Sequence, residues 1–416
     1  MKRPFLLFCA GAVFWLLVGA FVDVIADAKL LWPAFLDNQA WLTYGRLRPA
    51  ADNALLFGWA SQAGLAVMLW LLGRLGGTQP RSPALLVTSA VLWNAGVVIG
   101  FCGILLGRQG PHPGLEFPGS ASSILTLAFL LFTLCSLFLL LDRPNRPLFV
   151  SQWYLLAALL CFPWLYLTAN TLLVWSPVPG SAQLVLAAWY KACLFWLWLV
   201  PLGLAILYYL ISITTRRTIY AYPSSVFAFR AVVVLGGWTG LASFLGGPIS
   251  AWLVSVSISA CLLMLIPIVV IGINLLGTLR AAHWPRSPVL SFTLFSLLCL
   301  GIATLHSAAT PFTAPLTTYT GFAASVETLR LSAFTSMALF AAVYFIFPFV
   351  TSREISTSRV RLHYLLAAGS TTLLFLSEAL SFGETGSPFL RYLHFIAGVA
   401  YLFACILFAR NLLSRP

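Results

Sequence analysis

The sequence predicts an all-α membrane protein: one transmembrane domain over residues 1–416, built as a bundle of about twelve helices. Two observations predict this fold class: 61% of the 416 residues are hydrophobic, and only 8% are charged. A soluble domain carries about 25% charged residues, so this chain has too few charges to build a surface that faces water. The length accommodates about twelve spans of roughly 20 residues with short loops between them.

Apolar segments follow one another along the chain, separated by short loops that contain most of the arginines. We expect spans near residues 4–26, 53–73, 84–106, 121–141, 150–176, 182–213, 223–245, 249–277, 288–309, 319–350, 362–382 and 391–409. Residues such as Pro201 and Gly203 are tolerated inside a span when neighbouring helices shield the backbone. The first segment is apolar through Val24 and has no small-residue cleavage site after it, so we expect a retained helix.

The distribution of Lys and Arg predicts the orientation in the membrane. Twelve spans place both termini on one side, which collects fifteen basic residues: Lys2, Arg3, Arg74, Arg81, Arg143, Arg146, Arg216, Arg217, Arg280, Arg286, Arg353, Arg359, Arg361, Arg410 and Arg415. The opposite loops hold five: Lys29, Arg46, Arg48, Arg108 and Arg391. We therefore expect both termini in the cytoplasm, with the chain in the inner membrane. The net charge of +13 then reflects topology and not nucleic-acid binding, which needs a soluble basic surface.

Three segments resemble a known family. Trp41–Asn53 reads WLTYGRLRPAADN, Trp189–Tyr222 ends LAILYYLISITTRRTIYAY, and Thr320–Pro348 ends VYFIFP. They resemble the second helix, the sixth helix with its following loop, and the tenth helix of the catalytic subunit I of cbb3-type (C-family) cytochrome c oxidases, in the haem-copper oxidase superfamily. Hydropathy alone does not produce GRLRP, so the resemblance implies a bundle like that of oxidase subunit I.

The resemblance also implies where the family's metal ligands would lie, and every such position carries another residue. The two low-spin haem ligands fall on Ala51 and Thr328, the high-spin haem ligand on Val326, the three copper ligands on Ala192, Ala242 and Ser243, and the active-site tyrosine on Gly236. The resemblance therefore implies a degenerate homologue. We expect no catalytic residue, no metal and no bound cofactor.

The histidines and cysteines agree with that expectation. Two haems and a copper need six histidines in this architecture, and the chain has five. His112 and His283 fall in expected loops, whereas His306, His363 and His394 lie near expected span ends, where interfacial hydrogen bonding is the ordinary role. A haem or metal role for His306 together with His394 stays open. The eight cysteines lie in or beside apolar spans at spacings that fit no metal or disulfide pattern, so we expect them to pack as small apolar residues.

Five charged residues fall in or near expected spans: Lys191, Arg230, Glu327, Arg330 and Glu378. A charge at the bilayer centre costs about 2.5–3.5 kcal/mol, so such residues pair or line a polar path. Glu327 and Arg330 are three residues apart on one helix face, and Lys191 lies near the position of the lost metal centre. We favour an ion-pair plug of these three residues over a remnant proton path or ion site.

Two classes of function compete. In the first, the chain is a cofactor-free scaffold that docks a membrane-anchored c-type cytochrome of a respiratory complex. Phe195, Trp196 and Trp198 would then fill the lost cofactor volume, unless they face lipid. Arg46 and Arg48 would contact the partner, unless they only brace the loop against Asp37 or Asp52. In the second, a transporter or small-ligand or ion-binding protein reuses the old cavity, which predicts water-accessible space around Lys191 and Glu327.

Overall fold

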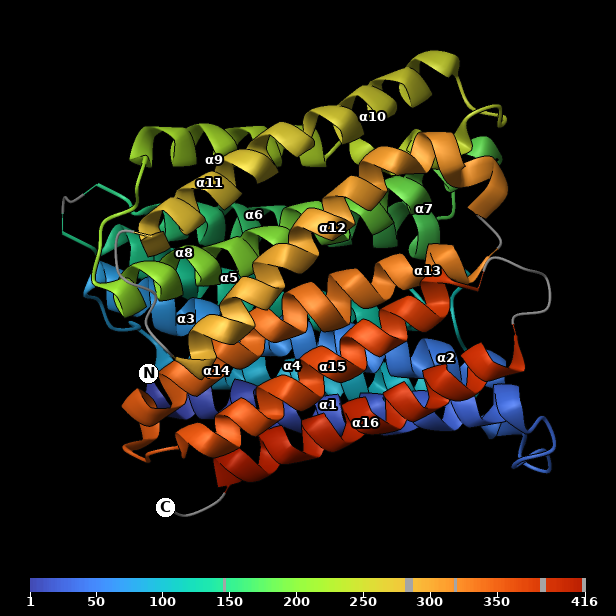
Figure 1. Cartoon of the computed structure of the whole chain (residues 1–416), viewed down its shortest axis with the longest axis horizontal. Coiled ribbons are helices and arrows are strands. Elements are labelled where there is room, and N and C mark those ends of the chain that lie inside the picture. The colour runs from blue at the N-terminus through green and yellow to red at the C-terminus, as the bar shows by residue number, and fades with distance from the viewer. Residues whose placement is uncertain (145–146, 281–286, 318–319, 382–386, 414–416) are drawn as a thin grey trace. The chain divides into compact units, whose positions relative to one another are not determined.

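A computed structural model describes residues 1–144, 147–280, 287–317, 320–381 and 387–413 (Figure 1). Every regular element over these ranges is a helix, and none of them is a strand, which confirms the predicted fold class. The backbone divides into two compact units: Met1–Arg146 with Val343–Pro416 (the first unit), and Pro147–Ala342 (the second unit). The expectation of one domain over residues 1–416 stays a prediction, and the units are described one at a time.

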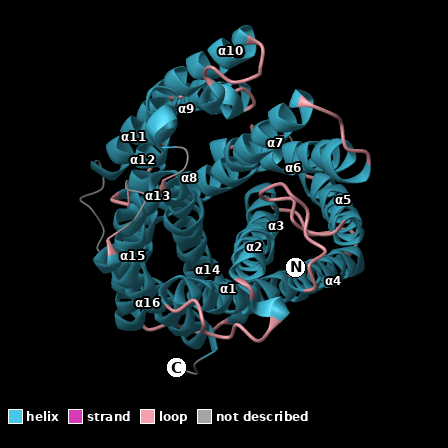
Figure 2. Cartoon of the chain, turned by 90° about the vertical axis from the view of Figure 1, so that its right-hand side faces the viewer, coloured by secondary structure: helices cyan, strands magenta, loops and turns pink. Residues whose placement is uncertain are grey.

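The first unit contains both ends of the chain. Its helices are α1 (Lys2–Leu31), α2 (Tyr44–Asn53), α3 (Gln62–Gly76), α4 (Pro83–Leu105), α5 (Gly119–Leu141), the end of α14 (Ser336–Thr351), α15 (Thr357–Ala379) and α16 (Pro388–Leu413), with a 3₁₀ turn η1 (Ala40–Leu42) and a π-helical stretch η2 (Ala54–Ser61). Helix α1 lies beside α4 and α16 in the end-on view of Figure 2, in agreement with the packing of these helices.

Helices α1 and α16 run antiparallel. Asp27, near the end of α1, contacts His394, near the start of α16, and Trp32 packs edge-on against Phe395. The start of α1 and the end of α16 therefore lie at the same end of this unit, as Figure 1 also shows. This is the arrangement that an even number of spans requires.

The second unit begins after α5 and ends within α14. Its elements are α6 (Val150–Ala169), η3 (Asn170–Trp175), α7 (Ser181–Cys193), η4 (Leu194–Leu199), α8 (Val200–Thr215), α9 (Tyr222–Gly236), η5 (Thr239–Phe244), α10 (Ala251–Leu263), α11 (Leu265–Arg280), α12 (Pro288–Thr317), α13 (Gly321–Glu327), η6 (Thr328–Thr335) and the start of α14. Phe334 of η6 occupies the space that a side chain on Gly203 of α8 would need, so this glycine permits the close packing of the two elements.

Ten helices of the described residues are long and apolar enough to cross a membrane, against about twelve expected spans. The expected span 223–245 is a 15-residue helix, Tyr222–Gly236, followed by a 3₁₀ turn, because Gly236 and Gly237 weaken the helix at that point. The expected span 362–382 corresponds to α15, whose Gly369–Thr372 stretch lowers its mean hydropathy; residue 382 itself lies outside the described residues.

Two further boundaries differ from the expectation. The second span begins at Tyr44 and not at residue 53, because the polar GRLRP segment is itself helical and continues through η2 into α3. The expected span 249–277 is interrupted at Met264, three residues before Pro267, which has no backbone N–H to continue the helix.

Candidate functional site

A cavity of about 290 Å³ lies within the second unit, between α7, η5, α12 and α13. Four of the six positions to which the resemblance assigns metal ligands line it: Ala192, Ala242, Ser243 and Val326. Of the other two, Thr328 begins η6 directly after α13, and Ala51 is fully buried in α2 of the first unit. Two of the three matched segments, through Ala192 and Val326, thus meet Ala242 and Ser243 of η5 at one cavity.

The side chains at these positions do not fit the cofactors that the resemblance implies. The three copper positions carry two methyl groups and one hydroxyl, whereas copper in proteins is held by imidazole, thiolate or thioether groups. Val326 offers no ligand atom to a haem iron. Gly236, to which the resemblance assigns the family's tyrosine, lies against Trp196, so a side chain there would meet Cβ of Trp196 at 2.9 Å.

Aromatic side chains of η4 form part of the wall of the cavity. The π-helical turn directly follows α7, and such turns often occur at functional sites. It buries Phe195, Trp196 and Trp198, of which Trp196 lines the cavity. These side chains are therefore interior and do not face lipid, yet they leave the cavity open.

Three charged side chains line the cavity. Lys191 Nζ lies 3.1 Å from Glu327 Oε1, and Arg330 Nη1 lies 3.4 Å from the same oxygen. Arg330 also donates through Nη2 to Ser307 Oγ at 3.2 Å, and its guanidinium lies 4.7 Å from the centre of the Phe195 ring. The side chains of Lys191 and Glu327 are 44% and 46% exposed, so the ion pair borders open space. Whether it acts as a plug stays a prediction.

His306 completes the polar lining. The imidazole packs against Phe322 with ring centres 4.5 Å apart. Both of its ring nitrogens are buried without a hydrogen-bond partner in the described part of the chain, and the same is true of Arg330 Nε. Two residues that line the cavity thus carry buried polar atoms for which no other described residue provides a hydrogen bond.

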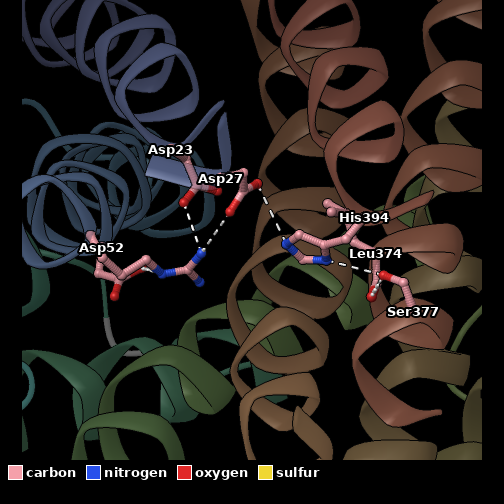
Figure 3. A network of polar contacts seen from close by, with 7 residues as sticks. Asp23, Asp27, Asp52, Leu374, Ser377 and His394 are labelled. Carbon is pink, nitrogen blue, oxygen red and sulfur yellow. Dashed lines mark hydrogen bonds and ion pairs between the residues drawn. The ribbon is translucent and has the colours of Figure 1, made fainter. Parts of the chain in front are cut away.

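The first unit contains a second polar cluster, shown in Figure 3. Arg48 Nη1 contacts Asp23 Oδ1 at 2.9 Å and Asp27 Oδ1 at 3.8 Å, and Arg48 Nε contacts Asp52 Oδ1 at 3.3 Å. His394 Nε2 lies 3.4 Å from Asp27 Oδ2. Arg48 thus finds its anionic partners within the chain, and Asp52 is one of the two carboxylates considered from the sequence.

His394, His363 and Arg46 also have partners. His394 Nδ1 is 3.0 Å from Ser377 Oγ, so both of its ring nitrogens are engaged. His363 is buried and shares a 3.0 Å hydrogen bond with the Tyr344 hydroxyl. Arg46 donates to the Leu105 carbonyl at 3.0 Å. His112 lies in the loop between α4 and α5, as expected, and His283 lies outside the described residues.

Sequence reasoning did not identify Asp23, Asp27 or Glu116 as site residues. The signal for the first two is a pair of carboxylates four residues apart inside an apolar segment, which places both on one helix face. Glu116 lies in the loop between α4 and α5, where its Oε2 accepts hydrogen bonds from Asn53 Nδ2 at 2.8 Å and from the Gly114 N–H at 2.7 Å. Burial raises the pKa of the Glu116 carboxyl to about 7.

Comparisons with known proteins agree with the resemblance. Residues 3–407 match the family described as cytochrome C and quinol oxidase polypeptide I. The chain is 24% identical over 382 residues to the cbb3-type cytochrome c oxidase subunit CcoN1 of Stutzerimonas stutzeri, which covers 89% of this chain and 81% of that protein.

Two further relatives are subunit 1 homologs of cytochrome c oxidase. The bacteroid homolog of Bradyrhizobium diazoefficiens is 26% identical over 314 residues, covering 71% of this chain and 56% of that protein. The homolog of Azorhizobium caulinodans is 25% identical over 311 residues, with 71% and 55% covered. The matched part of this chain thus spans little more than half the length of these two relatives.

Proposed function

This chain belongs to the family of cytochrome c and quinol oxidase polypeptide I, and we propose that it is a non-catalytic, cofactor-free member that scaffolds or anchors a respiratory electron-transfer complex. It is a multi-pass membrane protein related to cbb3-type oxidase subunits. The proposed location is the inner membrane of a bacterium, with both termini in the cytoplasm.

One observation carries the proposal. Ala192 and Val326 were assigned as ligand positions from separate motifs, Ala242 and Ser243 were assigned from the seventh helix between them, and all four line a single cavity. This convergence supports the assignment, because unrelated positions would have no reason to meet. With no imidazole at any of the four, the chain lacks the side chains that hold copper and the high-spin haem iron in its family. Electrons would then pass through the cofactors of a partner.

The proposed partner is a membrane-anchored c-type cytochrome. Relatives of this chain are named as subunits of cytochrome c oxidases, which supports a partner of that kind. Of the two docking residues considered from the sequence, Arg46 is the stronger candidate. Arg48 is held by three aspartates, whereas no carboxylate within salt-bridge distance of Arg46 belongs to the described part of the chain. A propionate or carboxylate of the partner would suit the Arg46 guanidinium.

Purification from the native membrane in a mild detergent tests the scaffold. The tagged chain should retain a c-type cytochrome, seen both as a subunit and in the haem spectrum. Arg46→Gln should reduce the amount retained, and Arg74→Gln, at the other end of the same span, should not. A chain that purifies alone, or only with proteins that carry no redox group, rules the scaffold out.

A second candidate function is supported by the open cavity. A transporter or a protein that binds a small ligand or ion would keep accessible space around Lys191 and Glu327, and both side chains are nearly half exposed there. Binding to the isolated chain, without any partner present, separates this function from the scaffold.

A further inference from the structure

We propose that the cavity in the second unit binds a small monoanion with oxygen acceptors, such as a short carboxylate or an inorganic oxyanion, between Lys191, Arg330 and His306. The inference rests on the second candidate function above and names its ligand class. It does not depend on whether the chain also docks a cytochrome.

The charge of the lining is the first argument. Lys191 and Arg330 are cationic, Glu327 is anionic, and the other described lining residues are neutral, apart from the titratable His306. The cavity therefore carries an excess of one positive charge. A cation entering it would meet a single carboxylate that two cations already hold, at 3.1 and 3.4 Å. An anion would be attracted, because Glu327 neutralises only one of the two positive charges.

The unsatisfied hydrogen-bonding groups are the second argument. Arg330 Nε is a donor, and a neutral imidazole carries one N–H, yet neither Arg330 Nε nor a ring nitrogen of His306 has a partner among the residues described. These nitrogens are covered by neighbouring atoms, so an acceptor in the cavity reaches them only when the imidazole or the guanidinium turns toward it, whereas the Lys191 side chain is already exposed to the open space. The hydroxyls of Ser307 and Thr310 already donate to backbone carbonyls of their own helix. The donors left for a ligand are thus those of cationic or imidazole groups.

The volume limits the size of the ligand. Pockets for drug-sized ligands measure about 300–1,000 Å³, and this cavity of about 290 Å³ lies at the lower end. It accommodates an anion of a few heavy atoms with some water. Trp196 forms part of the wall, so a longer chain would displace a buried indole.

Glu327 has a specific role in this arrangement: it is the resident counter-ion. A bound anion would take over part of its contact with Lys191 and Arg330, and the two negative charges would repel each other. Removing the charge of Glu327 should therefore tighten anion binding, whereas removing either cation should weaken it. A cation site would show the opposite pattern.

Isothermal titration calorimetry of the purified full chain in detergent tests the site. Sodium acetate and sodium nitrate are the probes for the carboxylate and inorganic classes, and ammonium and neutral acetamide are the controls. Acetate, nitrate or both should bind, and ammonium and acetamide should not. Lys191→Met and Arg330→Gln should each weaken binding at least tenfold, and Glu327→Gln should strengthen it at least tenfold. Arg230→Gln, which changes an exposed cation outside the cavity lining, should leave the affinity unchanged.

Size-exclusion chromatography establishes whether each variant is folded. If the other variants do not fold, Lys191→Met remains the informative one, because it keeps the contact between Arg330 and Glu327. No heat from either anion with the folded wild-type chain overturns the inference. So does weaker binding to folded Glu327→Gln, or an unchanged affinity in folded Lys191→Met. Binding of ammonium or acetamide in place of the anions would leave a ligand-binding function standing but would overturn the anion class.

Discussion

Lys191 Nζ lies 3.1 Å from Glu327 Oε1, an oxygen that Arg330 Nη1 also approaches at 3.4 Å. One carboxylate thus serves two cations, which come from α7 and η6. Removing the charge of Lys191 and removing the charge of Glu327 are therefore not equivalent. Loss of Lys191 leaves Glu327 paired with Arg330, whereas loss of Glu327 leaves two cations close together without their counter-ion.

We expect Glu327→Gln to destabilise the protein more than Lys191→Met, and the double variant to be less destabilised than the sum of the two. Because both side chains are nearly half exposed, the coupling should be modest, on the order of 1 kcal/mol or less. Thermal unfolding in detergent of the four proteins of the cycle measures it. Additive effects of the two substitutions would show that the contact contributes nothing to stability.

The residues at the assigned ligand positions predict that the chain by itself binds neither haem iron nor copper. The chain purified free of partner subunits should show no Soret band and no stoichiometric iron or copper, because the six assigned ligand positions carry alanine, serine, valine and threonine. Putting imidazoles back at Ala192, Ala242 and Ser243 should create a site that takes about one copper per chain, since imidazole is a good copper ligand. Elemental analysis and the visible spectrum are the measurements.

The matched control changes three exposed residues of the second unit that lie on different helices and do not line the cavity, Leu184, Val234 and Leu298, to histidine. This variant should gain no tightly bound copper. Stoichiometric iron in the unchanged chain, or no copper in the first triple variant, would mean that the ligand positions are assigned wrongly.

The helices were predictable because the physical signal is direct: lipid requires long apolar segments, and the chain shows them one after another. Helix α2 was missed as part of a span because its sequence YGRLRPAADN is polar, and its helical state does not depend on an apolar pattern. The break at Met264 depends on one proline within an otherwise continuous apolar run.

The candidate site was predictable only in part. Motifs located Ala192 and Val326, and the spacing of Glu327 and Arg330 indicated their local contact. The open space beside them depends on how Trp196 and the segments around Ala242 pack, which no local pattern determines. The cluster around Arg48 was missed for a similar reason, because only the antiparallel packing of α1 and α16 brings His394 to Asp27.

Glu116 predicts a pH dependence of stability in the first unit. Burial raises the pKa of its carboxyl from 4.5 to about 7, so the folded state binds a proton more tightly than the unfolded state. The stabilisation is fully present below pH 4.5 and is lost as the pH rises through about 7, with a total of no more than about 3 kcal/mol. Glu116→Gln keeps an acceptor for Asn53 and Gly114 and should remove this dependence.

Melting temperatures of the two proteins between pH 4.5 and 8 provide the measurement. The unchanged protein should lose more stability than Glu116→Gln as the pH rises. Parallel curves would show that Glu116 does not titrate in this range.

The antiparallel arrangement of α1 and α16, with the bias of basic residues, predicts that both ends of the chain face the cytoplasm. Alkaline phosphatase fused after residue 416 should be inactive, and a fusion in the loop between α4 and α5 should be active. Residues 414–416 lie outside the described residues, so the prediction rests on the end of α16. An active fusion after residue 416 contradicts it.

Arg48 is the cation around which the first unit's cluster is organised. Its guanidinium contacts Asp23, Asp27 and Asp52, and the Asp27 side chain is only 3% exposed. When Arg48 is removed, Asp27 keeps its contact with His394, but Asp23 loses the one ion-pair partner it has among the described residues, and an uncompensated buried charge costs up to about 3–5 kcal/mol. We therefore expect Arg48→Met to be among the most destabilising single changes in this chain.

Arg46→Met is the matched control, because among the described residues Arg46 donates only to the Leu105 carbonyl. Losing this hydrogen bond should lower the stability by about 1 kcal/mol. Arg48→Lys should be intermediate, since an ammonium keeps the charge but loses the fork that reaches carboxylates from two sides. Adding Asp23→Asn to Arg48→Met should restore part of the loss, because one of the carboxylates that repel each other becomes neutral. Thermal unfolding in detergent measures all four variants. If Arg48→Met is no more destabilising than Arg46→Met, the cluster does not hold α1 and α2 together, and Arg48 is then available to a partner as Arg46 is.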